Sequence, residues 1–116
     1  KSTPEEQAQK ALIMEQALKC AVQPPMEIME TCAEAFSLIV LAAEKGSVVA
    51  VSDAGVAASF CRAALEGASL NVFINTQGMQ DRAYAESLNS RARQLLAQYG
   101  EAADELVRSV IAKLGA

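Results

Sequence analysis

Apolar residues recur at helical spacing along the whole chain, in segments that proline or glycine separates, and this pattern most constrains the fold. The breaks are Pro24-Pro25, Gly46 and Gly78. Between them, apolar positions repeat every three or four residues, which places them on one face of a helix. With 116 residues there is room for one domain of ordinary size. The sequence predicts one all-α domain over residues 1–116, an antiparallel bundle of about four long helices.

The first half of the chain predicts two helices. Residues 4–22 form the first, because Thr3 is a good cap, Pro4 suits the first helical position and Glu6 completes a capping box. Pro24-Pro25 is expected to end it. The second helix is expected over residues 25–45, before Gly46, with an apolar stripe of Ile28, Met29, Cys32, Phe36, Ile39 and Val40.

The second half predicts two more helices after a connection. Residues 47–51 are rich in valine, but a strand so short has no partner, so we expect a loop. Ser52-Asp53 is then expected to start the third helix, which runs through Asn75 and stops at Gly78. Asp81 is expected to cap the last helix, which continues to residue 114.

The last helix carries a heptad-like apolar seam. Its positions alternate four and three residues apart: Leu88, Ala92, Leu95, Tyr99, Ala102, Leu106 and Ser109. A helix of this length spans roughly 50 Å, whereas a compact domain of this size measures roughly 27 Å across. We therefore expect this helix to pack on another chain, as in a homodimer or a higher homo-oligomer.

The third helix holds the candidate functional residues. It is apolar on both flanks, so we expect it to be buried for most of its length. Asn71 and Asn75 then lie one turn apart in an interior region, where an unpaired amide costs about 1–3 kcal/mol. They either bridge two helices and fix their register, or present donor and acceptor groups to a bound heterocycle. Gly67, one turn earlier, leaves room for a flat ligand or for close helix packing.

Ser52 and Asp53 allow two interpretations as well. Both residue types start helices, and the carboxylate of Asp53 is also a possible acid, base or partner for a cation. Asp53 and Asn71 are separated by 18 residues, about 27 Å along a helix axis. One chain therefore cannot hold one small group between them. A shared site needs a long ligand or a second subunit.

The composition excludes several classes of function. The chain has no histidine, so imidazole-based catalytic triads and histidine-ligated metal sites are excluded. Its net charge of −4 disfavours nucleic acid and anionic membranes as partners. The longest apolar stretch, residues 33–43, is too short to span a bilayer. Cys20, Cys32 and Cys61 have no metal-site spacing, so we expect free buried thiols, no bound metal and a cytoplasmic location.

Several motifs together resemble one enzyme family. They are Gly46-Ser47, the run Val51-Ser52-Asp53-Ala54-Gly55-Val56-Ala57, Ala64-Leu65-Glu66-Gly67-Ala68, Leu70-Asn71-Val72-Phe73-Ile74-Asn75 and Asp81. The opening Thr3-Pro4-Glu5-Glu6 and the Val22–Pro25 spacing fit too. Over essentially the whole chain, the sequence resembles the cyclodeaminase/cyclohydrolase family of folate enzymes. That family includes the C-terminal domain of formiminotransferase-cyclodeaminase and bacterial methenyltetrahydrofolate cyclohydrolases.

The resemblance implies an activity and a set of binding residues. The family acts by acid/base catalysis on the one-carbon unit between N5 and N10 of tetrahydrofolate, without a metal or a redox cofactor. Ser52, Asp53, Gly67, Asn71 and Asn75 are the implied substrate-binding residues, with Asp53 a possible catalytic group. A formiminotransferase domain is a possible partner.

The sequence departs from the family pattern in two places. Ser47 replaces the usual asparagine, and the chain resembles only the second half of the family's domain. We therefore expect the Gly-rich loop and the principal catalytic aspartate to lie outside it. The alternative function is a helical oligomerisation module without catalytic activity, in which Asn71 and Asn75 only fix helix register.

Overall fold

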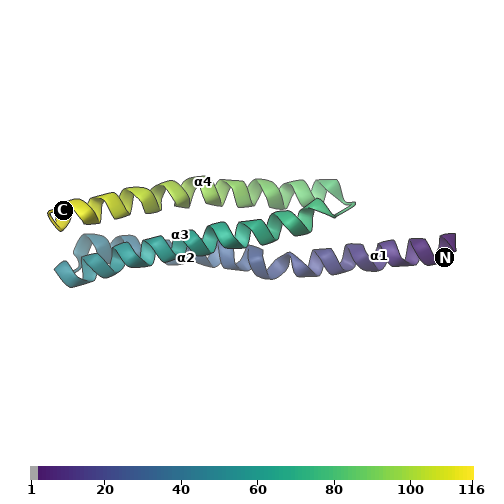
Figure 1. The fold of residues 1–116 in the computed structure, drawn as a ribbon, viewed down its shortest axis with the longest axis horizontal. Coiled ribbons are helices and arrows are strands. Elements are labelled where there is room, and N and C mark those ends of the chain that lie inside the picture. Colours follow the sequence, from purple (N-terminus) through teal and green to yellow (C-terminus); the bar gives the residue numbers. More distant parts are fainter. Residues whose placement is uncertain (1–2) are drawn as a thin grey trace.

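The computed structural model describes residues 3–116 as a slender bundle of helices, 68 × 20 × 19 Å in extent (Figure 1). The helices are α1 (Pro4–Ala21), α2 (Gln23–Lys45), α3 (Val48–Gln77) and α4 (Arg82–Lys113). α2, α3 and α4 run alternately up and down the long axis, and α1 extends beyond them at one end. The predicted all-α fold is confirmed.

α1 and α2 lie nearly end to end. Thr3 and Glu6 form the predicted capping box, with Thr3 N donating to Glu6 Oε1 over 3.0 Å and Glu6 N to Thr3 Oγ1 over 3.2 Å. Only Val22 separates the two helices, and Met26 N still donates to Val22 O over 3.2 Å. Pro24 and Pro25 fall in the first turn of α2, where a missing N–H costs nothing. The proline pair therefore interrupts the helix without turning the chain back.

α3 begins earlier than the sequence predicts. The expected loop over residues 47–51 is wrong, because helix begins at Val48 and Ser47 is its cap, accepting from Ala50 N over 3.4 Å. A single serine is enough to start the helix despite the valines that follow it. Ser52 and Asp53 lie inside α3 and cap nothing.

Side-chain hydrogen bonds of Asp81 and Arg82 fix the turn between α3 and α4. Asp81 caps α4 as predicted, accepting from Tyr84 N over 3.1 Å. Arg82 Nη1 donates to Thr76 O at the end of α3 over 2.8 Å and to Met79 O in the turn over 3.1 Å. The end of α3 is therefore closed by the helix that follows it.

The core divides into two apolar clusters along the bundle. The first comprises Val22, Met26, Met29, Leu65, Ala68, Val72, Met79, Ala85, Ala92 and Leu95. The second comprises Phe36, Ala43, Val51, Ala54, Ala58, Ala103, Leu106 and Val110. Tyr99 packs against both, and its ring meets that of Phe36 edge-on with centroids 5.7 Å apart.

The seam of α4 faces this core rather than another chain. Ala92, Leu95 and Leu106 are buried against α2 and α3, so the seam is occupied within the chain, and the packing of α4 on a second chain stays a prediction. The bundle is elongated, and α2 and α3 are long enough to cover α4. The chain's association with itself stays a prediction, and any such contact needs another surface.

Candidate functional site

One side of α3 is left uncovered by the rest of the chain. At 100° per residue, eight of its exposed positions form one stripe on the side of the helix opposite the core, and the exposed residues Ser59, Ala63, Glu66 and Leu70 lie beside that stripe. We call this stripe the α3 outer face; it comprises Val49, Asp53, Val56, Phe60, Ala64, Gly67, Asn71 and Ile74. The expectation that α3 is buried for most of its length is wrong, because α2 and α4 pack on only one side of it.

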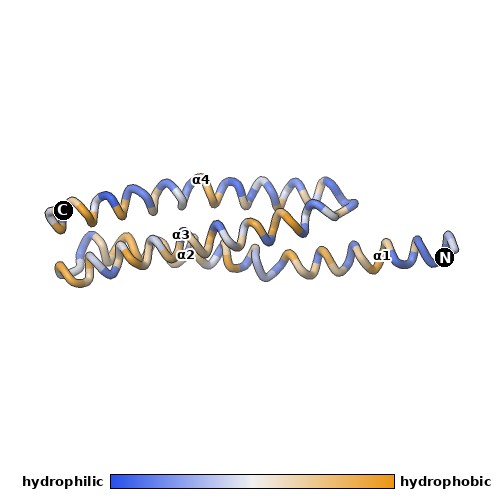
Figure 2. The backbone as a smooth tube through the Cα atoms, in the orientation of Figure 1, coloured by the Kyte–Doolittle hydropathy of each residue, from blue (hydrophilic) through white to orange (hydrophobic). Residues whose placement is uncertain are grey.

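The α3 outer face is unusually apolar for an exposed surface. The side chain of Phe60 is 72% exposed and that of Ile74 is 63% exposed. Figure 2 shows hydrophobic residues along α3, whereas the outside of α4 is mostly hydrophilic. By length and composition α3 also matches a membrane-spanning helix, although the core helices of water-soluble bundles match in the same way.

The two asparagines lie on or beside this face. Asn71 is exposed and Asn75 is half-buried, so neither occupies the interior position that the sequence predicts. Asn75 Nδ2 donates to Asn71 O over 2.7 Å, which ties the side chain to its own helix. The Asn75 Oδ1 atom and the Asn71 amide can meet a ligand without breaking that bond.

Gly67 lies on the same face, one turn before Asn71. A Cβ atom placed there would meet nothing within 4 Å. The glycine therefore leaves open space on this face and does not serve close packing within this chain.

Ser52 and Asp53 lie at the other end of the α3 outer face. Ser52 is half-buried and Asp53 is exposed. Within residues 3–116, no hydrogen bond or ion pair occupies the Asp53 carboxylate. The separation of about 27 Å from Asn71 holds in the straight helix, so one chain does not bring the two groups together.

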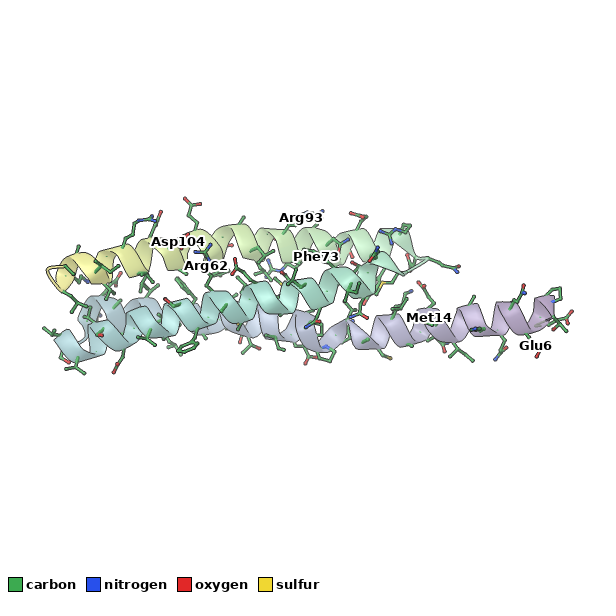
Figure 3. All side chains as sticks on the ribbon, viewed as in Figure 1. Glu6, Met14, Arg62, Phe73, Arg93 and Asp104 are labelled. Carbon is green, nitrogen blue, oxygen red and sulfur yellow. The ribbon has the colours of Figure 1, made fainter. Side chains whose placement is uncertain are left out.

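An open groove of about 690 Å³ lies between α3 and α4, and the sequence analysis missed it. Leu70, Phe73 and Leu96 line its apolar part. Arg62 forms an ion pair there with Asp104 (Figure 3). It forms another with Glu66 over 3.7 Å. The i, i+4 spacing of Arg62 and Glu66 was its only sequence signal. Glu101 adds a further carboxylate, so the groove fits an anionic ligand poorly.

The carboxyl groups of Glu30 and Asp81, whose pKa values are lowered, lie away from the α3 outer face. Arg91 donates to Glu30 from Nε over 2.8 Å and from Nη2 over 2.7 Å, and this lowers the pKa of the Glu30 carboxyl. The pKa of Asp81 is lowered by the hydrogen bond from Lys19 and then by that from Tyr84. These groups join helices to one another and are structural.

The cysteines are free thiols. The expectation that they are buried is wrong for Cys20, which is exposed, and only partly right for Cys32 and Cys61, which are half-buried. Burial, and then the neighbouring Cys32, raise the pKa of the Cys61 thiol to about 11, so it stays protonated at neutral pH. No cluster of three or more metal-binding side chains occurs in residues 3–116.

Comparison with known proteins gives these residues a context. The family model described as formiminotransferase-cyclodeaminase matches residues 1–94. The chain belongs to this family. All five predicted binding residues fall inside the matched segment.

Two kinds of relative are similar to this member of the formiminotransferase-cyclodeaminase family. A methenyltetrahydrofolate cyclohydrolase of Methylorubrum extorquens is 38% identical over 98% of the chain and 55% of its own length. Formimidoyltransferase-cyclodeaminases of mouse and chicken are each 32% identical over 83% of the chain and 18% of their own length. The chain thus spans about half the length of the bacterial relative and a smaller part of the animal ones.

Proposed function

We propose that this chain forms part of a folate enzyme that acts on the one-carbon bridge of tetrahydrofolate. The observation that carries the proposal is the match with the methenyltetrahydrofolate cyclohydrolase, which extends over 98% of the chain at 38% identity. This similarity favours a cyclohydrolase over a cyclodeaminase, because the animal formimidoyltransferase-cyclodeaminases match a smaller share of the chain, 83%, at a lower identity of 32%. A cyclohydrolase adds water to the bridging amidinium carbon, and the ring then opens.

The proposal gives the residues of the α3 outer face distinct roles. Asn71 and Asn75 present amide groups that can each donate and accept, as a pterin ring requires. Gly67 leaves space beside them for a flat ring. Asp53, with Ser52 beside it, offers a solvent-accessible carboxylate for proton transfer or for the positive charge of the amidinium.

The first test is binding and turnover of methenyltetrahydrofolate by the chain, followed through the absorbance of the bridged compound. A cyclohydrolase consumes this compound, whereas a cyclodeaminase forms it from the formimino compound and releases ammonia. Binding, not turnover, decides the test for this chain alone, because the principal catalytic aspartate is expected to lie outside it. A chain that binds neither compound would contradict the proposal.

Replacement of Asn75 by leucine tests the proposed binding role. Asn75→Leu should weaken binding of the folate by about 1–3 kcal/mol, because a ligand group loses its partner. The melting temperature should hold, because Asn75 bonds only to its own helix. Gln98→Leu, which removes an exposed amide on α4, is the matched control and should leave binding unchanged. Equal affinities of Asn75→Leu and wild type would show that Asn75 does not contact the ligand.

A further inference from the structure

Cys32 on α2 and Cys61 on α3 meet at the interface between these two helices. Cys61 Sγ donates to the carbonyl oxygen of Cys32 over 3.4 Å, and the two thiols also share a side-chain hydrogen bond. The residues are 29 positions apart in the sequence, so the packing of α2 against α3 brings them together. The folate chemistry proposed above uses neither thiol, and the pair therefore needs an explanation of its own.

The pair lies where the two apolar clusters of the core meet. Cys32 packs against the first cluster, which contains Met29, and Cys61 packs against the second, which contains Phe36. Cys61 points toward α2, and so away from the α3 outer face. A covalent bond between these two positions would join α2 to α3 in the middle of the bundle and restrain both parts of the core.

The two thiols differ in how a dissolved reagent reaches them. Cys32 lines an open hollow of about 370 Å³ on α2, together with Glu27, Ile28 and Thr31. The thiol of Cys61 keeps its proton at neutral pH, because burial and then the neighbouring Cys32 raise its pKa to about 11. Since the thiolate is the form of cysteine that reacts with oxidants, a small oxidant reacts at Cys32 first.

Cys20 lies too far from Cys32 to replace Cys61 in this pair. The two residues are 12 positions apart on helices that run nearly end to end, about 18 Å along the axis. A disulfide requires Cα atoms within about 7 Å of each other. The exposed Cys20 is therefore a control thiol, because no other cysteine of the chain is near enough to bond with it.

We propose that Cys32 and Cys61 form a reversible redox pair, in which hydrogen peroxide converts the two thiols into a disulfide between α2 and α3. In the first step the Cys32 thiolate attacks one peroxide oxygen and the O–O bond breaks, which leaves a sulfenic acid on Cys32 and releases hydroxide. The hydroxide takes up the proton that Cys32 lost, and so becomes water.

The second step forms the bond between the helices. The Cys61 sulfur attacks the Cys32 sulfur, the S–O bond of the sulfenic acid breaks, and its hydroxyl leaves as water with the Cys61 proton. The two thiols have then lost two protons and two electrons, and one peroxide has been reduced to two waters. A small thiol reverses the reaction by thiol–disulfide exchange.

The contact between the thiols gives the second step its advantage. The Cys61 sulfur already lies against Cys32, so it reacts within the chain before a second peroxide arrives. A second peroxide would convert the sulfenic acid of Cys32 to a sulfinic acid, which small thiols do not reduce. The pair thus keeps the oxidation of Cys32 reversible.

Mass spectrometry of the oxidised chain tests the pairing. Cys20→Ser protein is treated with hydrogen peroxide, and the remaining free thiols are then blocked with N-ethylmaleimide. The product should be lighter than the reduced protein by two hydrogen atoms and should carry no maleimide. Its peptides should show residue 32 linked to residue 61, and dithiothreitol should restore both thiols. A sulfinic acid on Cys32 beside an alkylated Cys61 would overturn the proposal, as would two thiols that do not react.

Substitution of each cysteine separates the two steps. In the Cys20→Ser background, Cys61→Ser should leave a sulfenic acid on Cys32, which dimedone traps. Cys32→Ser in the same background should leave Cys61 as a thiol that maleimide labels after denaturation. Oxidation of Cys61 in the second variant as fast as that of Cys32 in the first would overturn the order of the steps. Circular dichroism checks the folding of both variants, and the Cys20→Ser protein tests the pairing with both core cysteines in place.

Thermal unfolding tests whether the folded bundle accepts the bond. A cross-link between positions 29 apart constrains the unfolded chain, so oxidised Cys20→Ser protein should melt at least about 5 °C above the reduced protein. The protein with both Cys20→Ser and Cys61→Ser, treated in the same way, is the matched control and should show no such rise. An oxidised protein that melts below the reduced one would show that α2 and α3 must separate to form the bond, and would overturn the proposal.

Discussion

Lys19 on α1 and Asp81 at the start of α4 are separated by 62 positions in the sequence, but Lys19 Nζ lies 2.9 Å from Asp81 Oδ2. Glu15, one turn earlier on α1, accepts hydrogen bonds from Gln80 N over 2.8 Å and Asp81 N over 3.0 Å. α1 has no buried residue, so these polar contacts carry much of its attachment to the bundle.

Acid should therefore release α1 from the α3–α4 turn. Backbone hydrogen bonds lower the pKa of Glu15 below its ordinary value of 4.5, and the Lys19 hydrogen bond lowers that of Asp81 below 3.8. A lowered folded-state pKa gives stability that is complete above the ordinary value and is lost as the pH falls through the lowered one. Amide hydrogen exchange in α1 should rise below about pH 4 once corrected for intrinsic rates, before exchange in the core of α4 does. Simultaneous loss of protection in both helices would argue against it.

Removal of the Glu15 charge at neutral pH should have a similar local effect. Glu15→Gln keeps the shape of the side chain but weakens its hydrogen bonds to the amides of Gln80 and Asp81. Exchange of those two amides should become faster than in the wild type. Glu5→Gln, an exposed change in the first turn of α1, is the control and should leave both amides unaffected.

Thr76 should be important for stability at the end of α3. Its side chain is fully buried, and Oγ1 donates to Asn89 Oδ1 over 2.6 Å. Thr76→Val keeps the volume but leaves the Asn89 oxygen without its partner, so the free energy of unfolding should fall by about 1–3 kcal/mol in urea denaturation. Thr31→Val, an exposed change on α2, should stay within about 0.5 kcal/mol of the wild type.

The helical glycines should respond to substitution in opposite directions. A Cβ atom at Gly67 or Gly100 meets nothing within 4 Å, so alanine at either site should stabilise the monomer by about 0.5–1 kcal/mol. Gly55 is buried, and a Cβ atom there would lie 3.1 Å from Val110 Cγ1. Gly55→Leu should therefore destabilise the bundle by about 1–3 kcal/mol. Thermal melts measure these effects, and a Gly55→Leu protein that melts at the same temperature as Gly67→Ala would contradict them.

Local chemistry made the helix ends partly predictable from the sequence. The capping box at Thr3 and the cap at Asp81 act through side chains three residues away, so the sequence alone identifies them. Ser47 was missed because the valines after it have strand propensity, which a good cap and the packing of Val51 override.

The burial of individual faces could not be predicted in the same way. Periodicity shows that α4 has an apolar seam, but not that α2 and α3 are long enough to cover it. The sequence likewise placed Asn71 and Gly67 on one stripe, as the structure has them, but it could not say that no helix of this chain lies over that stripe. Burial depends on neighbours that are distant in sequence.

The end-to-end arrangement of α1 and α2 gives the protein the hydrodynamics of a rod. Its radius of gyration is 19.2 Å, whereas a compact chain of this length has about 13 Å. Friction on a rod exceeds that on a sphere of equal mass, so the monomer should elute from a sizing column ahead of globular standards of 12.2 kDa. Rotation of the rod end over end will be its slowest motion. The N–H bonds of the helices lie nearly along the helix axes, which are parallel, so the nitrogen relaxation rates of these amides will report that slow rotation.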